Sequence, residues 1–377
     1  MKILLVGNVI EDQQRSMLAF GHVLWHELQA RGHEARLVHP PLMFARLARS
    51  GGLFKWLGYI DKFLLYPWRL RRQAAWAEVV HVCDHSNAMY VPHVRTRPNL
   101  VTCHDVIAIQ AAAGMIEGWQ VSASGRVFQR LIRRGLGRAQ RIACVSQRTR
   151  EDLIALDIAP PERTTIVYNG LNADFRPAEP QAAAAALGAL GLRPDAPYLL
   201  HVGLDLPRKN RFAVLRAFAA LAASPDARAL WPQLTLVFVG PPLSASMRAF
   251  AEAQGLAGRV HVLQDLSAEA LRSVYSMALA LLFPSTSEGF GWPIIEAQAC
   301  GCPVLTSDIA PMNQIGGKAA MYVDPNDPEA MAAALLAQAP RLREMREEGL
   351  RNAAQFSKAG MIDAYEQLYR ELAERRT

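Results

Sequence analysis

Cysteine is scarce in this 377-residue sequence, and long apolar runs are missing. The five cysteines are odd in number and scattered, at positions 83, 103, 144, 300 and 302, and no pair has the spacing of a zinc site. Such a set argues against a disulfide framework and favours a reducing cytoplasm. No stretch approaches the ~20 apolar residues that a membrane-spanning helix needs. The run from Met1 to Gly7 is too short for a signal peptide and predicts a buried first strand instead.

The glycine motif of dinucleotide-binding enzymes is also missing. The first predicted strand is followed by Gly7-Asn8-Val9 rather than by Gly-x-Gly-x-x-Gly. In nicotinamide-dependent oxidoreductases that motif supplies the tight turn and the close approach to a pyrophosphate. The sequence therefore argues against this class of enzyme.

Charge is unevenly distributed along the chain. Residues 1–172 hold 22 Lys and Arg against 13 Asp and Glu, whereas residues 173–377 hold 19 against 21. A basic half beside a nearly neutral half indicates that the first half faces an anionic partner, such as anionic lipid, nucleic acid or a phosphorylated acceptor. A solvated basic surface without a partner is the alternative.

Residues 42–76 combine eight aromatic residues with seven Lys and Arg against one Asp. Such a mixture is typical of a segment that lies on an anionic membrane surface. Helices packed on a sheet with solvated arginines are the alternative. Nucleic acid is excluded from our prediction because no reading motif accompanies the charge. We predict a cytoplasmic protein that docks peripherally on the inner face of the cytoplasmic membrane through residues 42–76.

Short apolar runs alternate with helical stretches, which predicts an α/β fold with parallel sheets covered on both faces. Two such series are separated by residues 172–196, which carry prolines and an alanine-rich run. We expect a first domain over 1–172, joined by a C-terminal helix over about 361–377, and a second domain over 190–360. The predicted strands are 3–7, 35–39, 79–82, 100–103, 141–145, 165–168, 198–202, 234–239, 260–263, 279–283 and 303–306.

The most informative segment runs from Glu288 to Glu296 and places two carboxylates eight residues apart. Pro293 suits the first turn of a helix, so we expect Glu288 on a loop and Glu296 one turn into the helix. Gly289 and Gly291 leave backbone N–H groups open at the helix N-terminus, where a phosphate binds well. Two acids beside a phosphate suit a sugar nucleotide. Acids that favour the helix dipole with nothing bound are the alternative.

A second polar group is expected at the end of the strand over 198–202. Gly203 lets a ligand approach the backbone, and Arg208 and Lys209 follow at the start of the next helix. Two cations at a helix start suit a diphosphate, whose charge grows as a glycosidic bond breaks. An ordinary surface pair of cations is the alternative.

Two polar pieces lie in the first domain. His104 and Asp105 follow a predicted strand, at the edge where an open α/β sheet presents functional groups. A capping Asp beside a structural His is the alternative. Tyr168-Asn169-Gly170 is a turn signal near the expected cleft, so Asn169 is also a candidate ligand contact.

Together these motifs resemble the retaining nucleotide-sugar glycosyltransferases of the GT-B fold, family 4. The resemblance covers nearly the whole chain in the right order, and its specific part is the Glu-x7-Glu motif with Arg-Lys at this spacing. It implies two facing Rossmann-like domains with a ligand cleft between them. It also implies that a hexose is moved, with retention and without a metal or cofactor, from a nucleotide-diphosphate sugar to a glycan or lipid-linked saccharide in bacterial surface polysaccharide synthesis. GDP-mannose and UDP-sugars are the expected donors.

The resemblance implies roles for individual residues. Arg208 and Lys209 would hold the donor diphosphate in place of a metal, and the leaving phosphate would take the acceptor's proton. Glu296 would hold the ribose, Glu288 the sugar hydroxyls, and His104 would lie near the reactive centre of the sugar. The implied catalytic residues are His104, Glu288, Arg208 and Lys209. The implied donor contacts are Gly203, Arg208, Lys209, Asn169, Leu263, Leu266, Glu288, Gly289, Phe290, Gly291 and Glu296, and the implied acceptor-side residues are Gln14, Ser16 and Asp105.

Three positions depart from the family pattern. The first strand lacks the usual glycine pair after it, Trp292 stands where a smaller apolar residue is common, and Pro311-Met312-Asn313 lacks an acid often found after the proline. A sugar-nucleotide epimerase on the same scaffold and a non-catalytic nucleotide-sugar-binding protein stay open as alternatives. A phosphorylase is disfavoured because the chain has no signature of a lysine-bound pyridoxal group.

Overall fold

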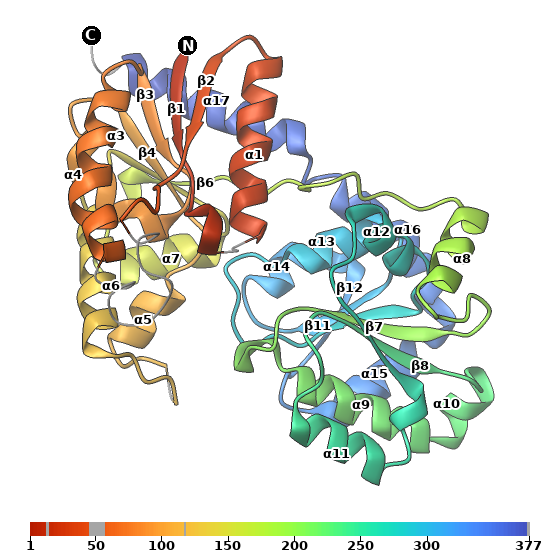
Figure 1. The fold of residues 1–377 in the computed structure, drawn as a ribbon. Coiled ribbons are helices and arrows are strands. Elements are labelled where there is room, and N and C mark those ends of the chain that lie inside the picture. Colours follow the sequence, from red (N-terminus) through yellow and green to blue (C-terminus); the bar gives the residue numbers. More distant parts are fainter. Residues whose placement is uncertain (13–14, 45–56, 117, 375–377) are drawn as a thin grey trace. The chain divides into compact units, whose positions relative to one another are not determined.

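The computed structural model describes residues 1–12, 15–44, 57–116 and 118–374. The chain divides into two compact units, the first formed by Met1–Asn172 with Lys358–Thr377 and the second by Ala173–Ser357 (Figure 1). The second unit begins before residue 190, where we expected it to begin, because α8 (Pro180–Ala189) packs against α12 (Ala268–Met277) within that unit. None of the described helices combines the length and the apolar character required to cross a bilayer.

The first unit contains a parallel sheet of six strands in the order β2-β1-β3-β4-β5-β6. The strands are β1 (Lys2–Val6), β2 (Glu34–Val38), β3 (Val79–Val82), β4 (Asn99–Cys103), β5 (Arg141–Cys144) and β6 (Thr164–Ile166). The strand order changes direction between β1 and β3, which pair in register from Ile3 and Val79. In open α/β sheets this switch point is where ligands bind, beyond the carboxyl ends of the strands.

The second unit contains a parallel sheet in the order β12-β11-β10-β7-β8-β9, with its switch point between β7 and β10. The strands are β7 (Tyr198–Val202), β8 (Thr235–Val239), β9 (Val260–Leu263), β10 (Ala280–Phe283), β11 (Val304–Ser307) and β12 (Ala320–Val323). All eleven predicted strands are present, with ends shifted by at most two residues. The edge strand β12 was missed because its four residues are short and only alternately buried.

Helices cover both faces of each sheet, as a doubly wound fold requires. In the first unit, α1 and α17 lie on one face and α3, α4 and α6 on the other; in the second, α9, α11 and α15 lie on one face and α8, α12, α13 and α16 on the other (Figure 1). The main helices not yet bounded are α1 (Arg15–Ala30), α3 (Tyr66–Ala74), α4 (Val91–Val94), α5 (Ile107–Ala112), α6 (Ala123–Leu136), α7 (Gln147–Ala155), α9 (Arg211–Ala223), α10 (Pro225–Leu230), α11 (Ala245–Ala253), α13 (Trp292–Ala299), α14 (Met312–Gly316), α15 (Pro328–Gln338), α16 (Leu342–Ala353) and α17 (Lys358–Glu374). The shorter helical segments are η1 (Ile10–Asp12), η3 (Asp61–Leu65), η4 (His85–Tyr90), η5 (Pro161–Arg163), η6 (Pro207–Lys209), η7 (Ala257–Arg259), η8 (Gly317–Ala319) and η9 (Ala339–Arg341).

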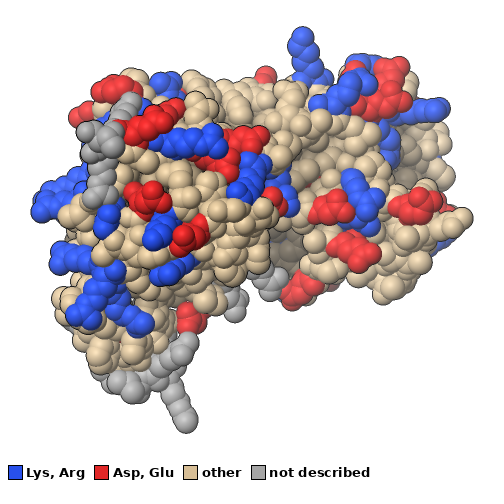
Figure 2. Space-filling model, turned by 90° about the horizontal axis from the view of Figure 1, so that it is seen from above, with Lys and Arg blue, Asp and Glu red and all other residues tan. Residues whose placement is uncertain are grey.

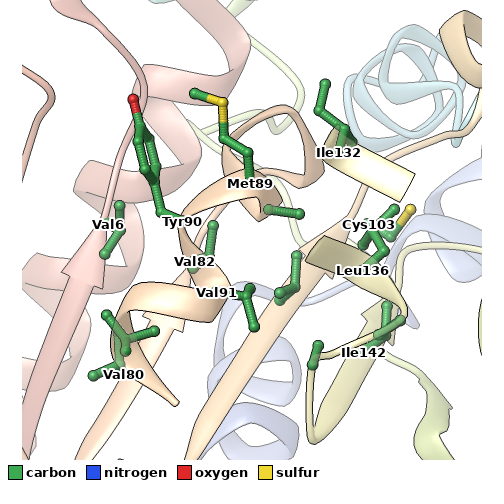
Figure 3. Close-up of a cluster of buried hydrophobic side chains, with 14 of the residues drawn as sticks. Val6, Val80, Val82, Met89, Tyr90, Val91, Cys103, Ile132, Leu136 and Ile142 are labelled. Carbon is green, nitrogen blue, oxygen red and sulfur yellow. The ribbon is translucent and has the colours of Figure 1, made fainter. Parts of the chain in front are cut away.

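The core of the first unit follows the two-residue period of its strands. Val80 and Val82 of β3 point to the face covered by α4 and α6, where they join Ile132 and Leu136 in one buried cluster (Figure 3). Residue 81 between them points to the opposite face. The five cysteines are all buried and unbridged, so they pack as small apolar groups.

The C-terminal helix α17 is fixed to that opposite face by a buried polar network. His81 contacts the Tyr369 hydroxyl through Nδ1 and the Thr102 hydroxyl through Nε2, both at 2.7 Å, and Thr102 contacts the Tyr365 hydroxyl at 2.8 Å. Burial lowers the pKa of His81 to about 3, so its ring is neutral. A neutral ring satisfied on both sides stabilises the docked helix without burying a charge.

Gly135 lets α6 approach the backbone of η4 more closely than any other residue would allow. A β-carbon at Gly135 would overlap the carbonyl oxygen of Ala88, a backbone atom that cannot turn aside. Gly188 on α8 has no heavy atom near the place where its β-carbon would lie. The first glycine is therefore required by packing, and the second is not.

We expect Gly135→Ala to lower the free energy of unfolding by about 3 kcal/mol, because overpacking must push α6 away from η4. Gly188→Ala should raise it by about 0.5–1 kcal/mol, since alanine is the better helix former and meets no neighbour. Urea denaturation of both variants measures the two effects. Equal effects of the two substitutions would contradict the close contact between α6 and η4.

Candidate functional site

The strongest polar cluster of the second unit lies at the switch point of its sheet. Strand β7 ends at Val202 and leads through Gly203 to η6, while β10 ends at Phe283 and leads to the loop over 284–291. His201 joins the two strands, because its Nδ1–H donates to the carbonyl oxygen of Leu282 at 2.9 Å. The loops that follow β7 and β10 therefore meet at the edge where ligands bind in such sheets.

Glu288 bridges both cations of η6. Its Oε2 accepts a hydrogen bond from Arg208 Nη1 at 2.7 Å, and its Oε1 accepts one from Lys209 Nζ at 2.5 Å. The Glu288 and Lys209 side chains are only 8% and 12% exposed, so the pair is largely removed from water. Arg208, which is 25% exposed, also donates to the carbonyl oxygen of Ser287. The three side chains form a compact group with a net charge of +1.

Backbone contacts hold the two loops of this ion cluster together. The N–H of Thr286 donates to the carbonyl oxygen of Arg208 at 2.8 Å. Asn210 follows η6 with a left-handed φ of 52° and donates through Nδ2 to the carbonyl oxygen of Pro325 at 2.5 Å. Asparagine tolerates that conformation better than most residues. The chain can therefore turn from η6 directly into α9 while the cations stay at the sheet edge.

The charge states within the cluster follow from burial and from the opposite charges. Burial of Glu288 favours its neutral form, but Lys209 and Arg208 outweigh this and lower the pKa of the carboxyl group. Burial also lowers the pKa of Lys209, and Glu288 opposes that shift. Glu288 is therefore ionised at neutral pH, and its charge favours the protonated form of Lys209.

Glu296 lies in α13, with Glu288 on the preceding loop, as the sequence predicts. Burial raises the pKa of Glu296 to about 7, against an opposing hydrogen bond from Tyr275 and the charge of Lys209. The Tyr275 hydroxyl donates to Glu296 Oε2 at 3.0 Å. Lys209 thus acts electrostatically on both carboxylates of the motif. Sequence reasoning missed Tyr275, because nothing in the spacing of α12 marks one of its buried residues as a partner of α13.

Glycines let backbone and ligand come close at this edge. A β-carbon on Gly203 would lie 3.2 Å from His201 Nε2 and 3.6 Å from Lys209 Cδ. A β-carbon on Gly240 would overlap the carbonyl oxygen of Gly203, so the ends of β7 and β8 also touch. Burial lowers the pKa of His201 to about 3, so its Nε2 presents a lone pair toward Gly203.

The remaining predicted donor contacts of the second unit lie around the same edge. Gly291 precedes α13 with a φ of 106°, which favours glycine, and Phe290 is buried between the rings of Trp292 and Phe356. Gly289 lies on the same loop as Glu288. Leu263 ends β9 and is buried, and Leu266 follows it half-buried. These placements agree with the expected segments, whereas their roles toward a ligand stay predictions.

The first unit carries its own polar cluster at its switch point, which sequence reasoning largely missed. Asp84, which follows β3, is buried and accepts hydrogen bonds from Asn8 Nδ2 at 2.5 Å and from Ser86 Oγ at 2.8 Å. His85 Nδ1 lies 3.1 Å from Asp84 Oδ1. Burial opposes ionisation of Asp84, but His85 and the hydrogen bond from Asn8 lower the pKa of its carboxyl group. The rule that pointed to His104 after β4 also applies to Asp84 after β3 and would have found it.

His104 and Asp105 lie in the same cluster but differ in their surroundings. His104 is buried, donates through Nε2 to the carbonyl oxygen of Cys83 at 3.0 Å, and packs edge-on against Phe20 at 4.9 Å. Burial lowers the pKa of His104. Asp105 accepts from the N–H of Ile107 at 3.0 Å, which is the capping contact of the alternative interpretation. The role of His104 toward a donor sugar stays a prediction.

Three further predicted residues lie in the first unit. Asn169 follows β6 and is 1% exposed, and its side-chain amide makes no hydrogen bond to any residue that the structure describes. A buried amide without a partner is costly, which makes it a candidate for a ligand contact. Ser16 is exposed on α1, one turn before Phe20. Gln14 lies outside the described residues.

Across the described part of the chain, no group of three or more His, Cys, Asp or Glu side chains is placed to hold a metal ion. Positive charge at the second switch point comes instead from Arg208 and Lys209. The geometry can therefore place an anion against two desolvated cations and a hydroxyl-rich group against two carboxylates. Metal independence stays a prediction.

Comparison with known families assigns each unit to a glycosyltransferase family. Residues 186–355 match the family described as glycosyl transferases group 1, and residues 22–175 match glycosyltransferase family 4. The first match falls in the second unit and the second match in the first, so the order along the chain agrees with the resemblance noted in the sequence.

Individual relatives and structures extend this similarity. The O-antigen chain mannosyltransferase B of Escherichia coli is 28% identical over 299 residues, which cover 78% of this chain and 75% of that protein. The D-inositol 3-phosphate glycosyltransferase of Thermobispora bispora is 33% identical over 250 residues, 63% of this chain, but the match spans only 57% of that relative. Anabaena HepE in complex with UDP-glucose has the same fold, with a TM-score of 0.74 at 16% identity over 99% of this chain and 100% of that one.

The raised pKa of Glu296 makes the stability of the unliganded protein depend on pH. Burial raises the pKa of this carboxyl group from its ordinary value of 4.5 to about 7 in the folded protein. The protonated form of Glu296 therefore contributes on the order of 3 kcal/mol to the free energy of unfolding. This contribution is complete below about pH 4.5 and is lost as the pH rises through 7. Glu296→Gln should thus melt higher than the wild type at pH 8 and close to it at pH 5, in scanning calorimetry at both pH values.

Tyr275→Phe supplies the control, because it removes the hydrogen bond that favours the charged carboxylate. We expect it to move the midpoint of the pH-dependent stability upward. If Glu296→Gln changed the melting temperature equally at pH 5 and pH 8, the assignment of the raised pKa to Glu296 would be wrong.

Proposed function

Because the chain belongs to the family 4 glycosyltransferases of the GT-B fold, we propose that it is a retaining hexosyltransferase that works without a metal. Its donor is a nucleotide-diphosphate sugar, and its acceptor is a glycan or lipid-linked saccharide of a bacterial surface polysaccharide. The observation that carries the proposal is the bridging of Arg208 and Lys209 by Glu288 at the switch point of the second sheet.

In this proposal the diphosphate of the donor lies against Arg208 and Lys209. Arg208 has five N–H donors and Lys209 three, so both keep donors for phosphate oxygens while they pair with Glu288. The two cations have already lost much of their hydration, which strengthens their attraction for a charge that grows on the leaving group. Gly203 leaves room beside Lys209 for the diphosphate.

The two carboxylates bind hydroxyl groups at either side of the diphosphate. Glu296, fixed by Tyr275, accepts hydrogen bonds from the ribose diol, and Glu288 accepts them from the sugar. No strong base is needed, because the departing phosphate takes the proton of the acceptor hydroxyl on the face that it leaves. Attack from that same face gives retention of the anomeric configuration.

Mannose is the hexose that we favour, from GDP-mannose, with a UDP-sugar as the second candidate. The relative matched over three quarters of its length is named an O-antigen chain mannosyltransferase, which supports mannose and a surface polysaccharide. The UDP-glucose complex of HepE supports the general class of donor, since its fold is shared.

We also propose that the first unit docks on an anionic membrane surface. Leu64 and Trp68 are 69% and 51% exposed one turn apart, and Val127 and Leu131 on α6 are 52% and 36% exposed at the same spacing. The two segments adjoin, because the rings of Phe63 and Phe128 lie 6.5 Å apart. The helices α3 and α6 also carry exposed arginines, and Figure 2 shows a group of Lys and Arg side chains at the lower left of the view. Of the predicted segment 42–76, residues 45–56 lie outside the described residues.

Membrane docking predicts that an exposed apolar residue contributes to lipid binding without supporting the fold. Leu64→Ser with Trp68→Ser should reduce co-sedimentation with phosphatidylglycerol vesicles by at least about tenfold, because both side chains leave the acyl boundary. Leu230→Ser, at a 53% exposed leucine of the second unit, is the matched control. Unchanged sedimentation of the double variant would exclude this surface.

The donor site is tested first by nucleotide binding. A screen of UDP, GDP, dTDP and their sugars in the presence of a chelator should give one nucleotide that raises the melting temperature, because a ligand of the folded state stabilises it by mass action. Lys209→Met should abolish the shift, since it removes the charge and keeps the shape. Arg216→Met removes a half-exposed cation of α9 and should keep it.

The reaction itself is tested by NMR of the product formed from the donor so identified. The anomeric configuration of the donor should be kept, and turnover should continue in the chelator. An inverted product, or turnover that requires magnesium, would contradict the proposed mechanism. A free nucleotide sugar of altered configuration as the only product would favour the epimerase, and binding without turnover would favour the non-catalytic protein.

A further inference from the structure

A cavity at the amino-terminal edge of the first sheet has no part in the proposed reaction. Its volume is about 490 Å³, and its walls come from residues that precede β4, β5 and β6 and from Leu372 of α17. His104 and Asp105 follow the other end of β4, five residues and about 16 Å away. The cavity is thus separate from the polar cluster at the carboxyl edge, and all of it belongs to the first unit.

Positive charge dominates this cavity. Arg95, Arg97, Arg138 and Arg163 line it, and no carboxylate is among the described residues of its wall. Four like charges around one concave space repel each other, and solvent screens them less there than on a convex surface. An anion bound in the cavity would offset the repulsion between the arginines by attracting each of them.

Two of the four arginines are held in place by backbone carbonyls. Arg163 Nη1 donates to the carbonyl oxygens of Gly137 at 2.9 Å and Ala139 at 3.0 Å, and Arg97 donates to that of Ala75. Cations often bind carbonyl oxygens at the C-terminal end of a helix. Arg163 has this role toward the carbonyls that follow α6. Each guanidinium has five donors, so both keep N–H groups for another acceptor.

The other two arginines, Arg95 and Arg138, do not bind backbone carbonyls of the described residues in this way. Within the described part of the chain, neither the Arg95 nor the Arg138 side chain makes a hydrogen bond or an ion pair. Arg97 and Arg163 are thus held in fixed orientations, whereas Arg95 and Arg138 can adjust theirs. The planar guanidinium groups of all four can donate pairs of hydrogen bonds to phosphate oxygens. A volume of 490 Å³ is also in the range of small-ligand sites.

We propose that this cavity, the arginine pocket, binds a small soluble polyphosphate of the inorganic diphosphate class, at a site separate from that of the donor. Several phosphate oxygens are needed to engage four guanidinium groups, which favours a diphosphate over a single carboxylate. Binding here does not depend on Arg208 and Lys209, which lie in the second unit. The inference therefore stands independently of the proposed transfer reaction.

The test is titration calorimetry of the full chain with inorganic diphosphate, at low salt and in a chelator. We expect two sites, one lost in Lys209→Met and the other in Thr96→Glu. Thr96 lines the pocket, so glutamate there places a carboxylate among the four arginines and competes with the ligand. Because it also relieves their repulsion, Thr96→Glu should melt no lower than the wild type, which separates loss of the site from loss of the fold.

A charge-matched control excludes a general effect of net charge. Arg95→Ser with Arg138→Ser should remove the pocket site, whereas Arg69→Ser with Arg126→Ser, two arginines outside the pocket, should keep it. If diphosphate binding survived Thr96→Glu with two sites, or if Lys209→Met abolished all binding, the proposal would be overturned. A single site that survives Lys209→Met and is lost in Thr96→Glu would support the pocket and count against the proposed donor site.

Discussion

The bridge that Glu288 makes between Arg208 and Lys209 is the interaction on which the ligand edge of the second unit depends. Two adjacent cations repel each other, and Lys209 is almost removed from water. Without the carboxylate, a buried charge would be left uncompensated, which typically costs 3–5 kcal/mol. The bridge also joins two segments 80 residues apart in sequence, since Glu288 lies on the loop after β10 and both cations lie in η6. The same contacts therefore determine the net positive charge of this edge and the positions of the two loops that form it.

The two sheets differ in strand order, but each has a switch point with an acidic side chain beyond it. In each one the order reverses at a switch point, between β1 and β3 or between β7 and β10, and an acid whose side chain is largely buried lies beyond it. Asp84 is paired with His85 and Asn8, whereas Glu288 is paired with two full cations. The first cluster holds two carboxylates, Asp84 and Asp105, beside His85, whereas the second holds one carboxylate beside two cations, so only the second edge carries a net positive charge.

Much of the fold could be predicted from the sequence because buried parallel strands are short apolar runs bounded by turns. The edge strand β12 could not, since Ala320 to Val323 are buried only alternately. The spacing of Glu288 and Glu296 gave their places on a loop and in α13, because Pro293 and the glycines fix that turn locally. Tyr275 acts through a tertiary contact with Glu296 that no local pattern encodes. Asp84, in contrast, directly follows the residues of β3 and could have been found by the rule that pointed to His104.

Several unfavourably buried polar groups lie at the carboxyl edges of the strands. Glu296 keeps a proton up to about pH 7, Asn169 buries an amide that no described residue satisfies, and His201 turns a lone pair toward Gly203. Each group lowers the stability of the unliganded fold, and each would be relieved by hydroxyl or phosphate groups brought by a ligand. A protein selected for stability alone would replace them with apolar residues. Their presence in buried positions, in the second unit beside the paired cations Arg208 and Lys209, is the physical argument for the binding role that we propose for these edges.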